Sequence, residues 1–182
     1  MSTILQEGNK LNTDTYLELF DFDASMLSDI NNVPGQIHYL TNSPTGGGVS
    51  GILWRGNTYY SLPFKLTGIT YAGDGTVNAR PTIAISNINK FFMAAMLSLG
   101  NLVGMKITRW RTFYKYTDNG SEPNTNMCYP IDEFLVIKKQ PSDNTTLTYE
   151  LSSVLDRPGI KLPRKLILRD QGFPGVSRVR AR

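Results

Sequence analysis

Residues 15–23 read TYLELFDFD, and this short stretch indicates the class of fold. Tyr16, Glu18, Phe20 and Phe22 alternate with Leu17, Leu19 and Asp21. A period of two residues places these sets on opposite faces of an extended chain, and aromatic residues are enriched in strands. The stretch therefore predicts a β-strand with apolar side chains on both faces.

Similar alternation on both sides of this stretch predicts further strands. A turn that tolerates positive φ at Arg55-Gly56-Asn57 predicts a hairpin over residues 52–64, and a Gly-Asp-Gly turn joins two strands within 65–86. Residues 132–154 predict a long hairpin that turns at 141–144. Single strands are expected at 36–42, QIHYLTN, and 104–116, GMKITRWRTFYKY. The Gly-rich residues 43–51 are expected to form a loop.

One helix is expected, at residues 87–99, because Ser86 or Asn87 can cap its start and Gly100-Asn101 is a stop signal. One helix cannot cover both faces of a parallel sheet. The fold class is therefore expected to be mainly β, a barrel or sandwich of antiparallel strands with one embedded helix. This helix carries a wide apolar stripe and Lys90 as its only charge, so it either plugs the barrel or meets another subunit.

The composition of the 182 residues fits one domain, with 40% hydrophobic and 19% charged residues. The longest apolar run, 91–105, is too short and too interrupted to span a bilayer. The first ten residues, MSTILQEGNK, lack the pattern of a secretory signal. These features predict a soluble protein that is made in a cytoplasm and has no membrane partner.

No catalytic constellation emerges from the sequence. Cys128 and His38 are the only residues of their kinds, so a disulfide, a thiolate metal site or a nucleophilic triad is not expected. Cys128 is expected to be a packed thiol and His38 a histidine on a strand face. Asp132 and Glu133 fall on opposite faces of a strand, too far apart to share acid–base work. The sequence therefore predicts a protein that is not an enzyme, with no catalytic, cofactor or metal residues.

The charge is concentrated in the second half of the chain. Residues 1–100 carry five Lys plus Arg and seven Asp plus Glu, whereas residues 101–182 carry fourteen and eight. Residues 157–182, RPGIKLPRKLILRDQGFPGVSRVRAR, hold eight basic residues and one acid. Such a segment can contact nucleic-acid phosphates, or it can lie as an extended arm across a partner subunit whose carboxylates it binds. We expect a β-barrel domain at 1–156 and an extended basic arm at 157–182.

Residues 66–119, LTGITYAGDGTVNARPTIAISNINKFFMAAMLSLGNLVGMKITRWRTFYKYTDN, resemble the central block of the phage minor tail protein L family of lambda-like siphophages. The shared order is an aromatic hairpin, a Gly turn, an Arg-Pro-Thr strand that ends in Ser-Asn, a helix, the letters LVG and a basic aromatic strand. The similarity runs over about residues 15–169 and includes LPRKLILRD at 162–170.

The resemblance implies a structural protein of the virion, at the tail tip or baseplate hub. Family members lie between the ring below the tail tube and the central hub or host-specificity protein, and are thought to form three-fold rings. The expected partners are these tail proteins, with the tape measure as a further candidate, and the expected oligomer is a homotrimer. The amino-terminal part of the family resembles the tube-type β-barrel. A basic β-barrel that binds nucleic acid through Trp110, Tyr114 and the arginines of 157–182 remains the alternative.

The chain departs from the family pattern after Arg169. Family members usually continue into a cysteine-rich domain with an iron–sulfur cluster, whereas no cysteine follows Cys128 here. We therefore expect the cluster to be absent, and QGFPGVSRVRAR to stand in place of that domain.

A set of basic and apolar residues is expected to contact partners. Pro81 fits a first strand position because it lacks an amide donor, and Arg80 beside it can pair with an acid of the next subunit or stay solvated. The complete candidate interface comprises Arg80, Phe91, Phe92, Met96, Arg109, Arg111, Arg164, Lys165, Arg169, Arg178, Arg180 and Arg182.

Overall fold

The computed structural model describes residues 4–10, 13–29, 31–43, 51–69, 80–86, 98–141 and 145–153. The expected helix lies outside this part of the chain except for Ser98 and Leu99, and so does the basic arm. The expected turns at 70–79 and 142–144 and most of the Gly-rich loop also lie outside it.

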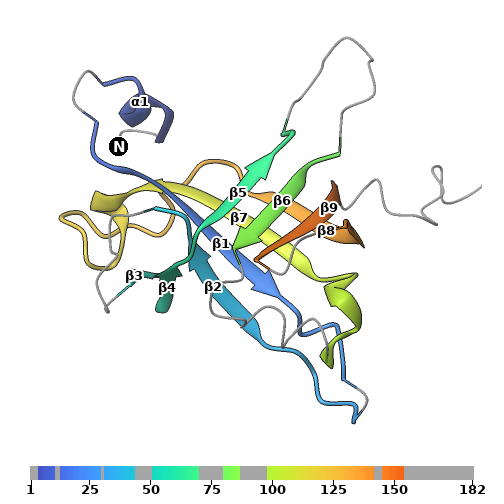
Figure 1. Ribbon diagram of the computed structural model, residues 1–182. Helices are drawn as coiled ribbons and strands as arrows, with labels where there is room; N and C mark the ends of the chain where they lie inside the picture. The colour runs from blue at the N-terminus through green and yellow to red at the C-terminus, as the bar shows by residue number, and fades with distance from the viewer. Residues whose placement is uncertain are drawn as a thin grey trace, which may run out of the picture.

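A single mixed sheet of nine strands forms the described part of the chain (Figure 1), and the prediction of a mainly β fold is confirmed. The strand order is β3-β4-β2-β1-β7-β8-β9-β6-β5. The strands are β1 (Tyr16–Asp23), β2 (Ile37–Thr41), β3 (Ile52–Trp54), β4 (Asn57–Ser61), β5 (Phe64–Thr67), β6 (Thr82–Ser86), β7 (Lys106–Phe113), β8 (Asp132–Lys139) and β9 (Thr146–Ser153). Short helical turns occur at α1 (Ile4–Gly8), η1 (Gly100–Leu102) and η2 (Tyr114–Tyr116).

The predicted hairpin turn is present between β3 and β4. Arg55 has φ 54° and Gly56 has φ 75°, so both central residues are in the left-handed region that a tight two-residue hairpin requires. Asn57, which the sequence placed in the turn, is the first residue of β4.

The strand expected at 104–116 is shorter than predicted. It ends at Phe113, and residues 114–116 form the 3₁₀ turn η2. Thr117 causes this change of direction, because both its backbone N–H and its hydroxyl donate to the carbonyl of Tyr114, at 3.0 and 2.7 Å.

One continuous stretch joins the two ends of the sheet. β4 pairs in parallel with β2, and after only Leu62 and Pro63 the chain enters β5, which pairs with β6. The β2–β4 pair is therefore an exception to the expected antiparallel pairing. Phe64 on β5 packs edge-on against Phe20 on β1, with ring centroids 4.7 Å apart. The sheet thus curls over itself into a barrel, and in Figure 1 β5 and β6 cross over β1 and β7.

The two faces of β1 contribute to two different apolar cores. Phe20 and Phe22 enter the main core inside the curled sheet, whereas Leu17 and Leu19 enter a second core on the outer face. The β3–β4 hairpin covers the second core with Trp54 and Tyr59. The alternation read from residues 15–23 is therefore confirmed, and both faces of this strand are covered.

Among the helices in the described part of the chain, none combines the length and the hydrophobicity that a membrane-spanning helix needs.

Candidate functional site

Four charged side chains meet at one end of the barrel. Arg109 and Arg111 lie on β7, Glu18 on β1 and Asp132 on β8. The strand register brings them together, because Glu18 is opposite Arg111 and Asp132 is opposite Arg109. We call these four residues the end cluster.

The end cluster is a network of ion pairs. Arg109 donates to the carboxylate of Glu18 and, at 3.3 Å, to Asp132 Oδ2. The Nη2 atom of Arg111 lies 3.4 Å from the same Asp132 oxygen and donates to the carbonyl of Pro130 at 3.1 Å. The side chains of Arg109 and Asp132 are only 13% and 11% exposed. Two cations and two carboxylates in one network hold one another more firmly than isolated surface pairs do.

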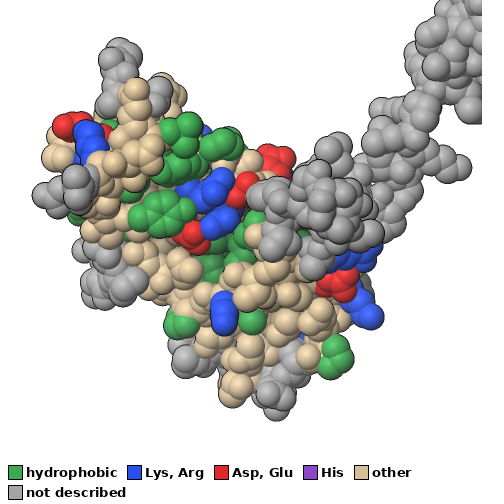
Figure 2. All heavy atoms as spheres, turned by 90° about the horizontal axis from the view of Figure 1, so that it is seen from above, with side chains coloured by type: hydrophobic (Ala, Val, Ile, Leu, Met, Phe, Trp, Pro, Cys, Tyr) green, Lys and Arg blue, Asp and Glu red, His purple; other side chains and the backbone are tan. Residues whose placement is uncertain are grey.

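Tyr16 and Tyr129 contact the end cluster, and Ile131 directly precedes its Asp132 in the chain. Tyr16 donates to Glu18 at 3.3 Å, and its ring meets that of Tyr129 edge-on at 6.3 Å. Burial, with a smaller contribution from Glu18, raises the pKa of Tyr16 to about 12, so its hydroxyl stays protonated. Tyr16 and Ile131 are nevertheless 44% and 47% exposed. Figure 2 shows basic and acidic side chains gathered between hydrophobic ones on the face seen from above.

This composition suits a protein–protein contact. Tyr and Arg are enriched at the centres of interfaces, and an exposed aliphatic residue beside them adds apolar area. The ion pairs hold the Arg side chains in place before a partner arrives, so little side-chain entropy remains to be lost on binding.

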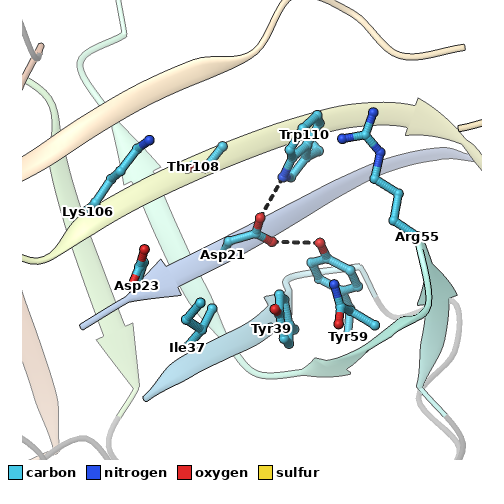
Figure 3. Close-up of a pocket in the computed structure, with 10 residues that line it drawn as sticks. Asp21, Asp23, Ile37, Tyr39, Arg55, Tyr59, Lys106, Thr108 and Trp110 are labelled. Atoms are coloured by element: carbon cyan, nitrogen blue, oxygen red, sulfur yellow. Dashed lines mark hydrogen bonds between the residues drawn. The ribbon is translucent and has the colours of Figure 1, made fainter. Parts of the chain in front are cut away.

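A second feature is a half-open pocket of about 230 Å³ on the outer face of β2, β1 and β7 (Figure 3). We call it the outer pocket. Its walls include three aromatic side chains and two carboxylates, together with one arginine from the β3–β4 turn. These are Tyr39, Tyr59, Trp110, Asp21, Asp23 and Arg55.

Asp21 forms the floor of the outer pocket, and both of its carboxylate oxygens are used. The Tyr59 hydroxyl donates to Oδ1 at 2.6 Å, and the Trp110 indole donates to Oδ2 at 2.7 Å (Figure 3). Burial raises the pKa of Tyr59, and the adjacent Asp21 carboxylate raises it further. This tyrosine is therefore a permanent donor to Asp21 at any ordinary pH.

Arg55 closes one end of the outer pocket. Its guanidinium lies 4.2 Å from the centre of the Trp110 ring and donates to the carbonyl of Thr125 at 3.2 Å. Asp118 secures the same turn from the other side, because its carboxylate accepts from the backbone N–H of Gly56 at 2.9 Å. The hairpin is thus clamped between β7 and the segment that follows it.

The structure places three of the sequence-predicted interface residues. Arg109 and Arg111 come together in the end cluster. Arg80 does not join them, because it forms an ion pair with Glu150 of its own chain at 3.0 Å. The other candidates, Phe91, Phe92, Met96, Arg164, Lys165, Arg169, Arg178, Arg180 and Arg182, lie outside the described residues.

Sequence reasoning missed the acids that meet these arginines. Glu18 and Arg109 are 91 residues apart, so their contact depends on a strand register that no local pattern reveals.

The predicted opposite faces of Asp132 and Glu133 are confirmed, because Asp132 meets Arg109 whereas Glu133 meets Lys106. Cys128 packs half-buried against the second core, as expected. Within the described ranges, no three His, Cys, Asp or Glu side chains are grouped as a metal site would require.

The fold and these two features define a small β-barrel domain with one charged, partly apolar end. The sequence model for phage minor tail protein L matches residues 32–173, so the chain belongs to the phage minor tail protein L family. It is therefore a structural tail protein of a phage, and the resemblance noted from the sequence is confirmed.

A curated relative supports the same assignment. The chain is similar to the tail tip protein L of Escherichia phage lambda, with 25% identity over 146 residues. The aligned part covers 77% of this chain and 62% of the relative. The chain thus spans about three fifths of the length of the lambda protein.

Proposed function

We propose that this protein is a ring component of the phage tail tip or baseplate, which joins the distal tail ring to the central hub. In this proposal three copies assemble into a ring through subunit interfaces, as a barrel domain at 1–156 with a basic arm at 157–182. The partners are the distal ring protein and the hub or host-specificity protein, with the tape measure as a further candidate. The protein is made in the host cytoplasm, acts in the virion and catalyses no reaction.

The observation that supports assembly best is the barrel end. There Tyr16 and Ile131, each nearly half exposed, adjoin the end cluster with its pre-positioned Arg109 and Arg111. A standard interface hides roughly 800 Å² per partner. One barrel end cannot supply all of this area, so we include Phe91, Phe92 and Met96 and the arm residues Arg164, Lys165, Arg169, Arg178, Arg180 and Arg182 in the proposed contact surfaces.

Arg80 is a second candidate contact in this proposal. Its side chain is 48% exposed although it pairs with Glu150. An exposed ion pair of this kind contributes only about 0–1 kcal/mol, so a carboxylate of a neighbouring subunit can share or replace Glu150 at little cost.

The alternative of nucleic-acid binding is weakened by one contact. Base stacking needs a free aromatic face, and the guanidinium of Arg55 already lies 4.2 Å from the Trp110 ring centre. We therefore favour protein partners over nucleic acid.

The proposal is tested by changing the barrel end without disturbing the core. We expect the purified wild-type chain to form trimers by native mass spectrometry and Ile131→Gln to shift the population toward monomer. Met26→Gln is the matched control, because Met26 is 85% exposed beyond the opposite end of β1. Trimers of Ile131→Gln at wild-type abundance would contradict a role for the barrel end, and a wild-type chain that stays monomeric even with its tail neighbours would contradict the ring.

A further inference from the structure

We propose that the outer pocket binds a guanidinium of the chain's own basic segment, and that Arg157 is the residue bound. The pocket thereby anchors the base of the segment 157–182 on the barrel from which it departs. This inference concerns a contact within one chain, so it does not depend on ring formation.

The pocket offers a carboxylate that has no cation among the described residues. Asp23 Oδ1 accepts from the backbone N–H of Ser25 at 2.9 Å, and Oδ2 has no bonding partner in the described part of the chain. Lys106 is the cross-strand neighbour of Asp23, yet its amine is bound to Glu133 at 2.7 Å. A half-buried carboxylate in this state favours a cation supplied from elsewhere.

The walls of the pocket favour arginine over lysine. Tyr39 is only partly buried and presents aromatic surface beside the carboxylates, and its ring is held edge-on against the buried Tyr59 with centroids 5.3 Å apart. A planar guanidinium can stack on such a ring while it donates two hydrogen bonds to one carboxylate, whereas an ammonium cannot. Arg55 at the far end already makes this kind of contact with Trp110. A volume of about 230 Å³ is below the roughly 300–1,000 Å³ of sites for drug-sized ligands, so it suits one side chain.

The strand register shows that the segment can reach the pocket. A single row of paired residues runs across the sheet from Ser152 to Leu135, Lys106 and Asp23. Three strand spacings make this row about 14 Å long. Arg157 comes five residues after Ser152, which corresponds to about 17 Å of extended chain, and its side chain adds further reach.

Charge and local sequence agree with this path. Glu133 lies on it beside Lys106 and is 45% exposed, so an approaching basic segment meets an acid before it reaches Asp23. Pro158 disfavours a helical conformation at Arg157, and Pro158-Gly159 is a turn signal directly after it. The seven basic residues beyond Arg157 remain for other contacts.

The first experiment uses the full chain and its two tryptophan indole resonances in a ¹H–¹⁵N spectrum. We expect Arg157→Gln to shift the Trp110 indole resonance and the Asp23 amide resonance, and to leave the buried Trp54 indole unchanged. Arg164→Gln is the matched control, because it removes the same charge from the same segment and should shift neither. Equal spectra for wild type and Arg157→Gln would overturn the proposal.

A second experiment determines whether the contact lies within one chain. A spin label on Gly159→Cys in a Cys128→Ala background should broaden the amide resonances of Asp23, Tyr39 and Thr108, and Asp23→Asn should abolish this broadening. When ¹⁵N-labelled chains that carry no spin label are mixed with spin-labelled chains that contain no ¹⁵N, we expect no broadening. Broadening of the ¹⁵N-labelled chains in this mixture would show that the segment binds a neighbouring copy and would overturn the assignment to the same chain. If Asp23→Asn fails to fold, Arg157→Gln in the spin-labelled chain provides the same test from the other side of the contact.

Discussion

The hydroxyl of Tyr59 donates to Asp21 Oδ1 at 2.6 Å and ties the β3–β4 hairpin to the central strand of the barrel. Tyr59 is 1% exposed, so water cannot easily replace this donor. Tyr59→Phe should lower the free energy of unfolding by about 2 kcal/mol, because a hydrogen bond to a charged group is lost. Urea denaturation measures the change. Tyr60→Phe, on the exposed side of the same strand, should alter the midpoint little.

Arg55 combines a left-handed backbone with a stacked side chain, and two substitutions separate these effects. Arg55→Gly relieves the positive φ but removes the contact with Trp110, which is worth about 0.5–1 kcal/mol. Arg55→Ala removes the same contact but keeps a non-glycine residue at a positive φ, which is unfavourable. We therefore expect Arg55→Ala to be the less stable variant in thermal unfolding. The reverse order would show that the turn does not require the left-handed conformation.

Asp132 and Glu133 are adjacent acids on opposite faces of β8, and they form a matched pair for the end cluster. Asp132→Asn leaves Arg109 and Arg111 without their shared carboxylate in a site that is nearly buried, so it should cost about 3 kcal/mol. Glu133→Gln breaks an exposed pair with Lys106 and should cost less than about 1 kcal/mol. Chemical denaturation of the two variants checks this, and similar losses would mean that the end cluster is a solvated surface feature.

Local pattern was sufficient to predict the strands but not their arrangement. Residues 15–23 and the 132–154 hairpin were predicted because a two-residue period and turn residues are local properties, and β1, β8 and β9 confirm them. The parallel β2–β4 pair and the contact of Glu18 with Arg109 depend on register between distant strands. No period in a single sequence encodes that register, so the parallel pair through which the barrel closes and the acids of the end cluster were not predicted.

The closure of the barrel makes a further prediction at Phe64. Its ring packs edge-on against Phe20 at 4.7 Å and Phe22 at 5.9 Å, and it is the first residue of β5 after the chain leaves β4. Phe64→Ala should lower stability by about 3–5 kcal/mol, because it leaves a cavity where the sheet meets itself. Tyr60→Ala, four residues earlier and 57% exposed, is the control and should cost far less. Equal losses in denaturant titrations would contradict closure through Phe64.

Glu7 in the N-terminal helix α1 should make the free energy of unfolding depend on pH. Glu7 of α1 is buried and bonded to Lys10 and Lys115, and these two cations hold its pKa at about 2 instead of 4.5. A carboxyl whose pKa is lowered by folding stabilises the native state above its unfolded pKa, and this contribution disappears as the pH falls toward the folded value. Glu7→Gln should therefore be less stable than wild type at pH 6, and the difference should shrink steadily between about pH 4.5 and 2. Denaturation midpoints of both proteins across this range measure the effect, and other titrating groups cancel because both proteins contain them. Glu122→Gln, at an exposed position far along the chain, should show no such convergence. If Glu7→Gln were destabilised relative to wild type as much at pH 2 as at pH 6, Glu7 would act through its packing and not through its charge.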